Sequence, residues 1–370
     1  MLRKFIYIAG TLLLLGSIAW EFKLNILMWS MPKIGSIIYP IHENIPTSWS
    51  EGPELDRQDD RPNIILILAD DMGYNDISSH NGGAADGSLK TIHIDALANS
   101  GILFSRGYAA NATCGPSRAS IMTGRYPTGF GYEFTPVPAP GRLILSWIAE
   151  EDDSELKGRI NKELSRNLPP FMEQGMPTEQ ITIAEVLQDA GYYTAHIGKW
   201  HLGHGEFKYS PAGRGFNDFF GAYHGGADHW EHIVWPGGGP HRDAIRRSQN
   251  NNGALKGMGR NIIGEAIDHK HDRFARDGTF IHEHITTDNM THSSDAFTNQ
   301  AIQMIWEHNV EKDGQLFLYL PYTAPHWPTQ FYQQDADFNS HIPGQKRREF
   351  AGMITHLDRC IAKIVDVLKR

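Results

Sequence analysis

The sequence predicts an α/β fold in which a mostly parallel sheet is sandwiched by helices. Short, continuously apolar runs recur along the chain, and such runs are typical of strands buried on both faces of a parallel sheet. Segments with helical periodicity lie between these runs, so strands and helices alternate. The expected strands are 64–69, 102–108, 193–197 and 316–322, and the expected helices are 92–100, 117–123, 180–190, 295–308 and 347–370.

Local signals define the elements in the first half of the chain. The folded body begins at Pro62, and the strand at 64–69 is an uninterrupted apolar run that ends at Asp70. The helix at 117–123 follows Pro116, which favours the first turn of a helix because its missing N–H has no partner there in any case. Polar residues therefore stand after a strand and at a helix start, where ligands bind in open α/β sheets.

The second half of the chain continues the alternation. The strand at 193–197 is followed by the hexapeptide 198–203, which contains a lysine and a histidine, and the strand at 316–322 is centred on the apolar run 317–320. The last expected helix is amphipathic, because apolar residues recur at helical spacing. These residues are Met353, Leu357, Ile361 and Ile364.

Size and composition describe a globular protein. The chain has 370 residues, of which 40% are hydrophobic and 21% charged, so wholesale disorder is excluded and one large or two medium domains are expected. A net charge of −9 argues against nucleic-acid binding, which needs a basic surface. The only cysteines, Cys114 and Cys360, do not form a disulfide framework.

The N-terminus indicates export. Two basic residues precede the apolar run 5–20, which is the pattern of a secretory signal, although no clear cleavage site follows. We therefore expect a signal peptide or membrane anchor at 1–25, a linker at 26–61 and the catalytic domain at 62–370. The positive charges before the apolar run predict that the body lies outside the cytoplasm, on the periplasmic or extracellular face.

Two segments look like insertions. Residues 141–175 form a charged excursion for which a helix is one option, whereas residues 236–294 are rich in Gly, Asn and His with little periodicity and are expected to be irregular. The second segment contains His269, His271, His282 and His284, which raise the question of zinc. These residues lack the helical spacing and the further ligands of a recognised zinc site, so we interpret them as loop or surface residues.

The run Cys114-Gly115-Pro116-Ser117-Arg118 is the most informative motif. It places a thiol at a helix start, where free N–H groups and a partial positive charge attract an anion. Arg118 lies one helical turn beyond Cys114 and can share its face. A nucleophile, an anion cradle and a guanidinium thus lie within five residues, which predicts a site for an oxyanion ester. A buried structural cysteine is the alternative.

The adjacent carboxylates of Asp70 and Asp71 predict a metal site. Such carboxylates repel each other unless a cation compensates them. Oxygen ligands suit a hard divalent cation, and Ca²⁺ is favoured over Mg²⁺ when the ligands all come from protein. The alternative is a solvated acidic turn.

Three further polar residues follow expected strands. Lys199 and His201 come just after 193–197, and alternation would send both side chains the same way if the strand continued. His326 follows 316–322 between two prolines, which fix the backbone around it. A lysine supplies a point charge for an anionic oxygen, and a histidine can transfer protons. Each residue alone could equally be structural.

Three of these segments resemble the motifs of the formylglycine-dependent, arylsulfatase-like sulfatases of the alkaline phosphatase superfamily. They are Cys114-Gly115-Pro116-Ser117-Arg118 with Thr123-Gly124-Arg125, Gly198-Lys199-Trp200-His201, and Pro325-His326-Trp327-Pro328. The resemblance implies an alkaline-phosphatase-like fold over 62–370 and hydrolysis of sulfate monoesters. It also implies that a formylglycine-generating enzyme oxidises Cys114 to formylglycine.

The resemblance also assigns roles to the candidate residues. The metal, Ca²⁺ rather than Mg²⁺, would be held by Asp70, Asp71 and the modified Cys114. Arg118 and the metal would polarise the aldehyde hydrate, and Lys199 and the metal would balance charge on the sulfuryl oxygens. His326 would protonate or orient the leaving alcohol, and His201 would act as a base. The implied substrate is a sulfated carbohydrate or an aryl sulfate. Apart from the resemblance, the apolar run at the N-terminus would contact a membrane if it is an uncleaved anchor rather than a cleaved signal.

One landmark of the family is missing from the sequence. The family's Asp-Asn pair, which supplies further metal ligands after a late strand, has no counterpart after His326. The only Asp-Asn, at 288–289, precedes that strand, and we do not assign it to the metal. We therefore expect a fold that lacks its C-terminal part. A phosphate or phosphonate ester hydrolase of the same superfamily and a non-catalytic, truncated binding protein remain alternatives.

Overall fold

The computed structural model describes most of the chain between Arg61 and Lys369, and all of the described residues belong to one unit, Thr47–Arg370. The described residues are 61–80, 82–136, 161, 163, 167–169, 173–203, 206–223, 229, 269–274, 280–285, 292–308, 313–327 and 329–369. The predicted segment 1–25, nearly all of the predicted linker 26–61 and most of the predicted insertion 141–175 lie outside them. Within the described residues, no helix is long and apolar enough to cross a membrane.

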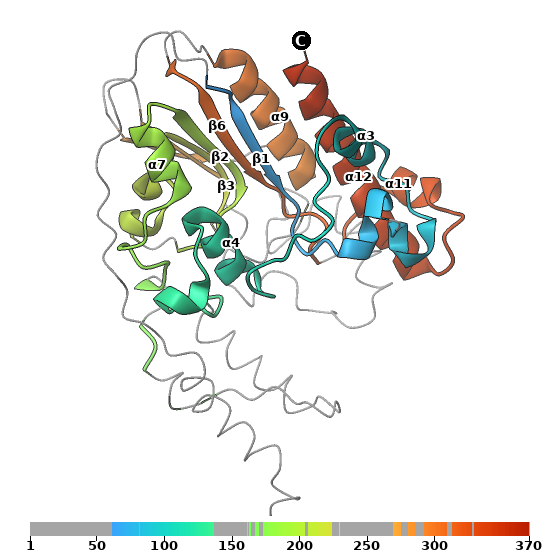
Figure 1. Ribbon diagram of the computed structural model, residues 1–370, viewed down its shortest axis with the longest axis horizontal. Coiled ribbons are helices and arrows are strands. Elements are labelled where there is room, and N and C mark those ends of the chain that lie inside the picture. Colours follow the sequence, from blue (N-terminus) through green and yellow to red (C-terminus); the bar gives the residue numbers. More distant parts are fainter. Residues whose placement is uncertain are drawn as a thin grey trace, which may run out of the picture. The chain divides into compact units, whose positions relative to one another are not determined.

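A six-stranded mixed sheet forms the centre of the described part, in the order β1-β6-β2-β3-β4-β5 (Figure 1). The strands β1, β6, β2 and β3 pair in parallel, whereas β4 pairs antiparallel with both β3 and β5. This arrangement confirms the predicted fold class. The strand bounds are β1 Ile64–Leu68, β2 Tyr193–Lys199, β3 Asp218–Ala222, β4 His269–Phe274, β5 Phe280–Ile285 and β6 Leu316–Pro321.

Helices cover both faces of the sheet (Figure 1). On one side lie α9 and α12 with α3 and α11 beside them, and on the other side lie α4 and α7. The helix bounds are α3 Ile92–Ser100, α4 Cys114–Thr123, α7 Ile183–Asp189, α9 Ser293–Glu307, α11 Gln333–Phe338 and α12 Gln345–Leu368. Short 3₁₀ segments occupy Tyr74–Asp76, Ser78–His80, Pro127–Phe130, Phe207–Tyr209 and Ala212–Arg214, and Gly83–Gly87 forms one π-helical turn.

The strand β6 shows why a continuously apolar run was the right signal. All six of its residues are buried, and they alternate between the two faces of the sheet. Leu316, Leu318 and Leu320 pack with α9 and α12, whereas Phe317 and Tyr319 pack on the side of α4 and α7. A strand with a core on each face has no position for a solvated polar residue.

Capping signals fix the helix ends. At the start of α7 the Thr182 hydroxyl accepts from the Glu185 N–H (3.1 Å), and the Glu185 carboxylate accepts from the Thr182 N–H (2.7 Å), which is a capping box. The helix α4 ends at Gly124, whose φ of 65° is the left-handed conformation typical of a glycine there. The predicted helices all exist, with ends shifted by a few residues.

Three predictions about the elements were wrong. The segment 102–108 forms no strand; Ile102, Phe104 and Tyr108 are 80%, 77% and 89% exposed, and no described strand pairs with the segment. The insertion 236–294 is not wholly irregular, because it contains β4 and β5. His269, His271, His282 and His284 therefore stand on strands rather than in loops.

The strand β3 was missed because Gly221 interrupts its apolar pattern. Gly221 has a φ of 152° and is the register partner of Gly198 in β2. A Cβ added at Gly221 would lie 2.0 Å from the Gly198 carbonyl oxygen. The two backbones approach so closely that position 221 must be glycine. From the sequence alone, a glycine required inside a strand cannot be distinguished from a glycine that marks a turn.

Candidate active site

The helix α4 carries Cys114 in its first turn and Arg118 one turn later, as predicted, although it begins at Cys114 rather than at residue 117. Arg118 is only 2% exposed. Its Nη1 donates to the Lys199 carbonyl oxygen (2.7 Å), and its Nη2 lies 3.1 Å from Asp70 Oδ1. The guanidinium therefore joins α4 to the ends of β1 and β2.

Asp70 follows β1 and is the buried anion of the site. Its backbone N–H donates to the Ala324 carbonyl (3.1 Å), which ties it to the segment after β6. Its Oδ2 accepts from Lys199 Nζ at 2.5 Å. Burial acts to raise the pKa of Asp70, but the positive charges of Arg118 and Lys199 outweigh it and hold the pKa below its usual value.

Asp71 projects differently from its neighbour. Its φ of 62° is the left-handed conformation, and its side chain is 51% exposed. A left-handed conformation in a residue other than glycine is uncommon and costs energy, so it is maintained by the structure around it. The two adjacent carboxylates consequently serve different purposes: Asp70 pairs with the buried cations, and Asp71 reaches the solvent side next to His326.

His326 follows β6 in a turn that contains a cis Ala324–Pro325 peptide bond. Its N–H donates to the Thr323 carbonyl (3.0 Å), and its ring is 5.5 Å from that of Trp327, nearly parallel to it. Its Nδ1 contacts the Trp327 carbonyl oxygen, which can only accept, so Nδ1 carries the proton. Its other ring nitrogen, Nε2, lies 3.5 Å from Asp71 Oδ2.

The thiol of Cys114 lies among these groups. Burial acts to raise its pKa, but a hydrogen bond with His326 and the charge of Lys199 outweigh both burial and the charge of Asp70. The pKa of Cys114 is therefore lowered, which is the environment of a reactive thiol rather than of an inert core cysteine. This observation also places Cys114 beside Asp70, Lys199 and His326, although the chain brings them from four separate segments.

His201 lies next to the site, but the condition for its predicted orientation is not met. The strand β2 ends at Lys199, and His201 has a φ of 62°. Its backbone N–H donates to the Tyr223 carbonyl (3.0 Å), and its carbonyl accepts from the Tyr132 hydroxyl (3.4 Å). A Cβ added at Gly115, in the first turn of α4, would lie 3.5 Å from the His201 carbonyl oxygen, so the backbone of His201 lies against the start of α4. A catalytic role for its ring stays a prediction.

The donor set is suited to a hard cation. Asp70 and Asp71 offer carboxylate oxygens at one sheet edge, and an oxygen-bearing derivative of Cys114 would add another oxygen there. The strain at Asp71 fits a carboxylate that is held toward a ligand. These residues would hold the metal, and Arg118 and Lys199 balance the charge of Asp70 in its absence.

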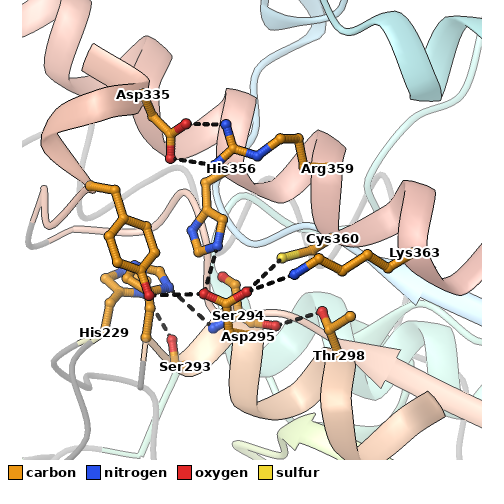
Figure 2. A network of polar contacts seen from close by, with 12 residues as sticks. His229, Ser293, Ser294, Asp295, Thr298, Asp335, His356, Arg359, Cys360 and Lys363 are labelled. Atoms are coloured by element: carbon orange, nitrogen blue, oxygen red, sulfur yellow. Dashed lines mark hydrogen bonds and ion pairs between the residues drawn. The ribbon is translucent and has the colours of Figure 1, made fainter. Parts of the chain in front are cut away.

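A second polar cluster, which the sequence did not predict, joins α9 to α12 (Figure 2). Asp295 Oδ2 accepts from His356 Nε2 (2.9 Å) and from the Tyr332 hydroxyl (3.0 Å). Its Oδ1 accepts from Lys363 Nζ (3.2 Å) and lies 3.9 Å from Cys360 Sγ. Histidine, aspartate and cysteine together resemble a metal-ligand set. The carboxylate is already satisfied by protein donors, so we interpret the cluster as an ion-pair network.

The comparisons with known proteins agree with this geometry. A family model described as Sulfatase matches residues 62–370. The chain belongs to the sulfatase family. Arylsulfatase G of Rattus norvegicus is 37% identical over 161 residues, which are 44% of this chain and 24% of that protein. Steryl-sulfatase of Homo sapiens is 37% identical over 166 residues, which are 44% of this chain and 23% of that protein.

Solved structures share the fold. The crystal structure of Ps i-CgsB matches with a TM-score of 0.58 and 30% identity, covering 83% of this chain and 55% of that one. The same protein has been solved in complex with k-i-k-neocarrahexaose. The sulfatase family and these neighbours confirm the predicted alkaline-phosphatase-like fold. This sulfatase chain spans only part of the length of the relatives and the solved structure described above.

Proposed function

We propose that this sulfatase hydrolyses sulfate monoesters through a formylglycine made from Cys114. The observation that supports the proposal is the convergence of Cys114, Arg118, Asp70, Lys199 and His326 at one edge of the sheet. A monoester of sulfate carries negative charge on its peripheral oxygens. Two buried cations beside a nucleophile are the arrangement that stabilises such charge as it shifts during transfer.

The nucleophile would be one hydroxyl of the hydrated aldehyde at position 114. Its oxygen attacks sulfur as its proton is lost, the S–O bond to the leaving alcohol breaks, and that alcohol takes a proton. The second hydroxyl then loses its proton, the aldehyde C=O bond forms again, and sulfate leaves. Water restores the hydrate. This sequence needs a proton acceptor in each of its two steps and a proton donor for the leaving alcohol.

The residues of the site fit these roles. His326 directs Nε2 toward the site, and with both ring nitrogens protonated it donates the Nε2 proton to the leaving alcohol while Nδ1–H stays on the Trp327 carbonyl. Lys199 and Arg118 hold the sulfuryl oxygens, in the same positioning and electrostatic logic as phosphoryl transfer. His201 is the local candidate for the base of the second step. A Ca²⁺ ion on Asp70 and Asp71 would supply the positive charge that favours deprotonation of the attacking hydroxyl.

The proposed substrate class is a sulfated carbohydrate, ahead of an aryl sulfate. Trp327 is 53% exposed directly beside His326, and a tryptophan face is a surface on which a sugar ring can stack. Ps i-CgsB, which has been solved with a carbohydrate ligand, supports the same class. We further propose that the protein is exported, with its N-terminal segment as a signal or anchor, and is matured by a formylglycine-generating enzyme.

The test is sulfate release by the protein co-expressed with a formylglycine-generating enzyme. The Cys114→Ala variant should lose all turnover while keeping its fold, because alanine suits a helix start. Cys360→Ala, which removes the other thiol, is the matched control and should keep activity. Sulfate and phosphate esters assayed side by side separate a sulfatase from a phosphatase of the superfamily. Full activity in Cys114→Ala would overturn the proposal.

A further inference from the structure

A buried histidine outside the family motifs, His229, holds the backbone of His326. Its Nε2 lies 2.7 Å from the His326 carbonyl oxygen, and its own backbone N–H donates to Gln330 Oε1 (2.6 Å). The side chain of His229 is fully buried. The imidazole of His229 is buried and donates its N–H to one backbone carbonyl in the turn that carries His326. It therefore holds this carbonyl in place and does not face solvent.

The hydrogen-bond partners assign the tautomer of His229. A carbonyl oxygen only accepts, so Nε2 carries the proton and Nδ1 must accept. The two available donors are the Ser293 and Thr323 hydroxyls, each 3.2 Å from Nδ1 and 3.0 Å from one another. Burial lowers the pKa of His229 to about 4, so the neutral ring persists at working pH.

His229 is itself anchored to a rigid element. The Ser293 N–H, at the start of α9, donates to the His229 carbonyl (2.5 Å), and Figure 2 shows the ring of His229 directed toward the Ser293 side chain. On its other side the ring stacks on His292 at 5.3 Å and 7°. The position of the His326 carbonyl is therefore set by the first turn of α9.

The His326 carbonyl in turn sets the orientation of the His326 ring. This carbonyl belongs to the peptide plane that joins His326 to Trp327, and the next carbonyl, that of Trp327, contacts His326 Nδ1. If the first carbonyl rotates, the Trp327 backbone moves and the partner of Nδ1 moves with it. The imidazole ring of His326 then no longer keeps one orientation, and its Nε2 atom is no longer held beside Asp71.

We propose that His229 is a positioning residue that aims His326 Nε2 at the leaving-group oxygen. This inference rests on the proposed function, in which His326 protonates the leaving alcohol. A displaced general acid loses part of a contribution of about 10²–10⁴ in rate. The loss should matter for an alkyl alcohol, which must be protonated to leave, and matter little for a nitrophenol, which leaves as a stable anion.

The experiment compares His229→Met and His229→Gln with the parent protein on a sulfated sugar and on nitrophenyl sulfate. Methionine fills the space but donates nothing, so kcat on the sulfated sugar should fall by about 10- to 100-fold with nearly unchanged KM. Turnover of nitrophenyl sulfate should fall by less than about threefold on the same reasoning. Glutamine can place an amide N–H near the position of Nε2 and should restore most of the lost rate.

The outcomes separate this inference from the proposed function. His326→Ala serves as the reference, because loss of the acid itself must show the same dependence on the leaving group. If His326→Ala affects both substrates equally, the role proposed for His326 fails. If His326→Ala discriminates between the substrates but His229→Met slows both equally, or glutamine restores nothing, His229 is only structural and the inference is wrong.

Discussion

The ion pair between His356 and Asp295 should make the stability of the protein depend on pH in the alkaline range. His356 is 3% exposed on α12, and its ring stands edge-on to the rings of His292 (4.7 Å) and Tyr332 (4.8 Å). Burial acts to lower its pKa, but its contacts with Asp295 and Cys360 outweigh burial and raise the pKa to about 9. The other charge facing this pair is Lys363.

The direction and magnitude of this pH dependence follow from the linkage between proton binding and folding. A histidine whose pKa rises from 6.5 when unfolded to about 9 when folded binds its proton more tightly in the folded state. Its contribution to stability is complete below pH 6.5 and is lost as the pH rises to about 9. At about 1.4 kcal/mol per pKa unit, the free energy of unfolding should decrease by about 3 kcal/mol across that window.

The assay is urea denaturation at intervals from below pH 6.5 to above pH 9, on the parent protein and on His356→Gln. The variant should be less stable at low pH and should lose the pH-dependent decrease. The exposed His341→Gln is the matched control and should follow the parent curve. Parallel curves for the parent and His356→Gln would refute the linkage argument, because another group would then carry the pH dependence.

Three further predictions concern the site and the core. Arg118→Lys should lower kcat/KM by about 100-fold in steady-state kinetics, because an ammonium cannot bridge both the Lys199 carbonyl and the Asp70 carboxylate; a change of less than about threefold would contradict this reasoning. Removal of metal by a chelator should abolish sulfate release, and Ca²⁺ should restore more activity than Mg²⁺; full activity after chelation would exclude the metal. Asp358→Ala should cost about 1–2 kcal/mol in urea denaturation, because the buried carboxylate accepts two backbone N–H groups in the first turn of α3; unchanged stability would show that α3 needs no such cap.

The sequence predicted β1, β2 and β6, three of the four strands that pair in parallel, and missed β3. The runs that became β1 and β6 are continuously apolar, and this signal can be seen without knowledge of the partner strands. The segment 102–108 begins with three apolar residues, Ile102, Leu103 and Phe104, but forms no strand, because a strand also needs neighbouring strands that the local pattern does not contain. For β4 and β5 the error has the opposite direction: strands form where the sequence analysis expected a loop, because these segments are rich in histidine and lack a continuous apolar run.

Some residues of the site could be identified from the sequence, and others could not. Asp70, Cys114, Lys199 and His326 follow strands or begin a helix, and their motifs made them identifiable before their contacts were known. His229 stands 97 residues before His326, the residue whose carbonyl it contacts, and no local signal marks it. The polarity of Asp295 and His356 was equally uninformative, because only the packing of α9 on α12 brings them together.

The most direct measurement is mass spectrometry of the peptide that contains Cys114, taken from protein co-expressed with a formylglycine-generating enzyme and matched to sulfate release in the same preparation. Our account predicts an aldehyde at position 114 and an activity that rises in proportion to the fraction converted. An unmodified thiol in a preparation that releases sulfate at full rate would contradict it.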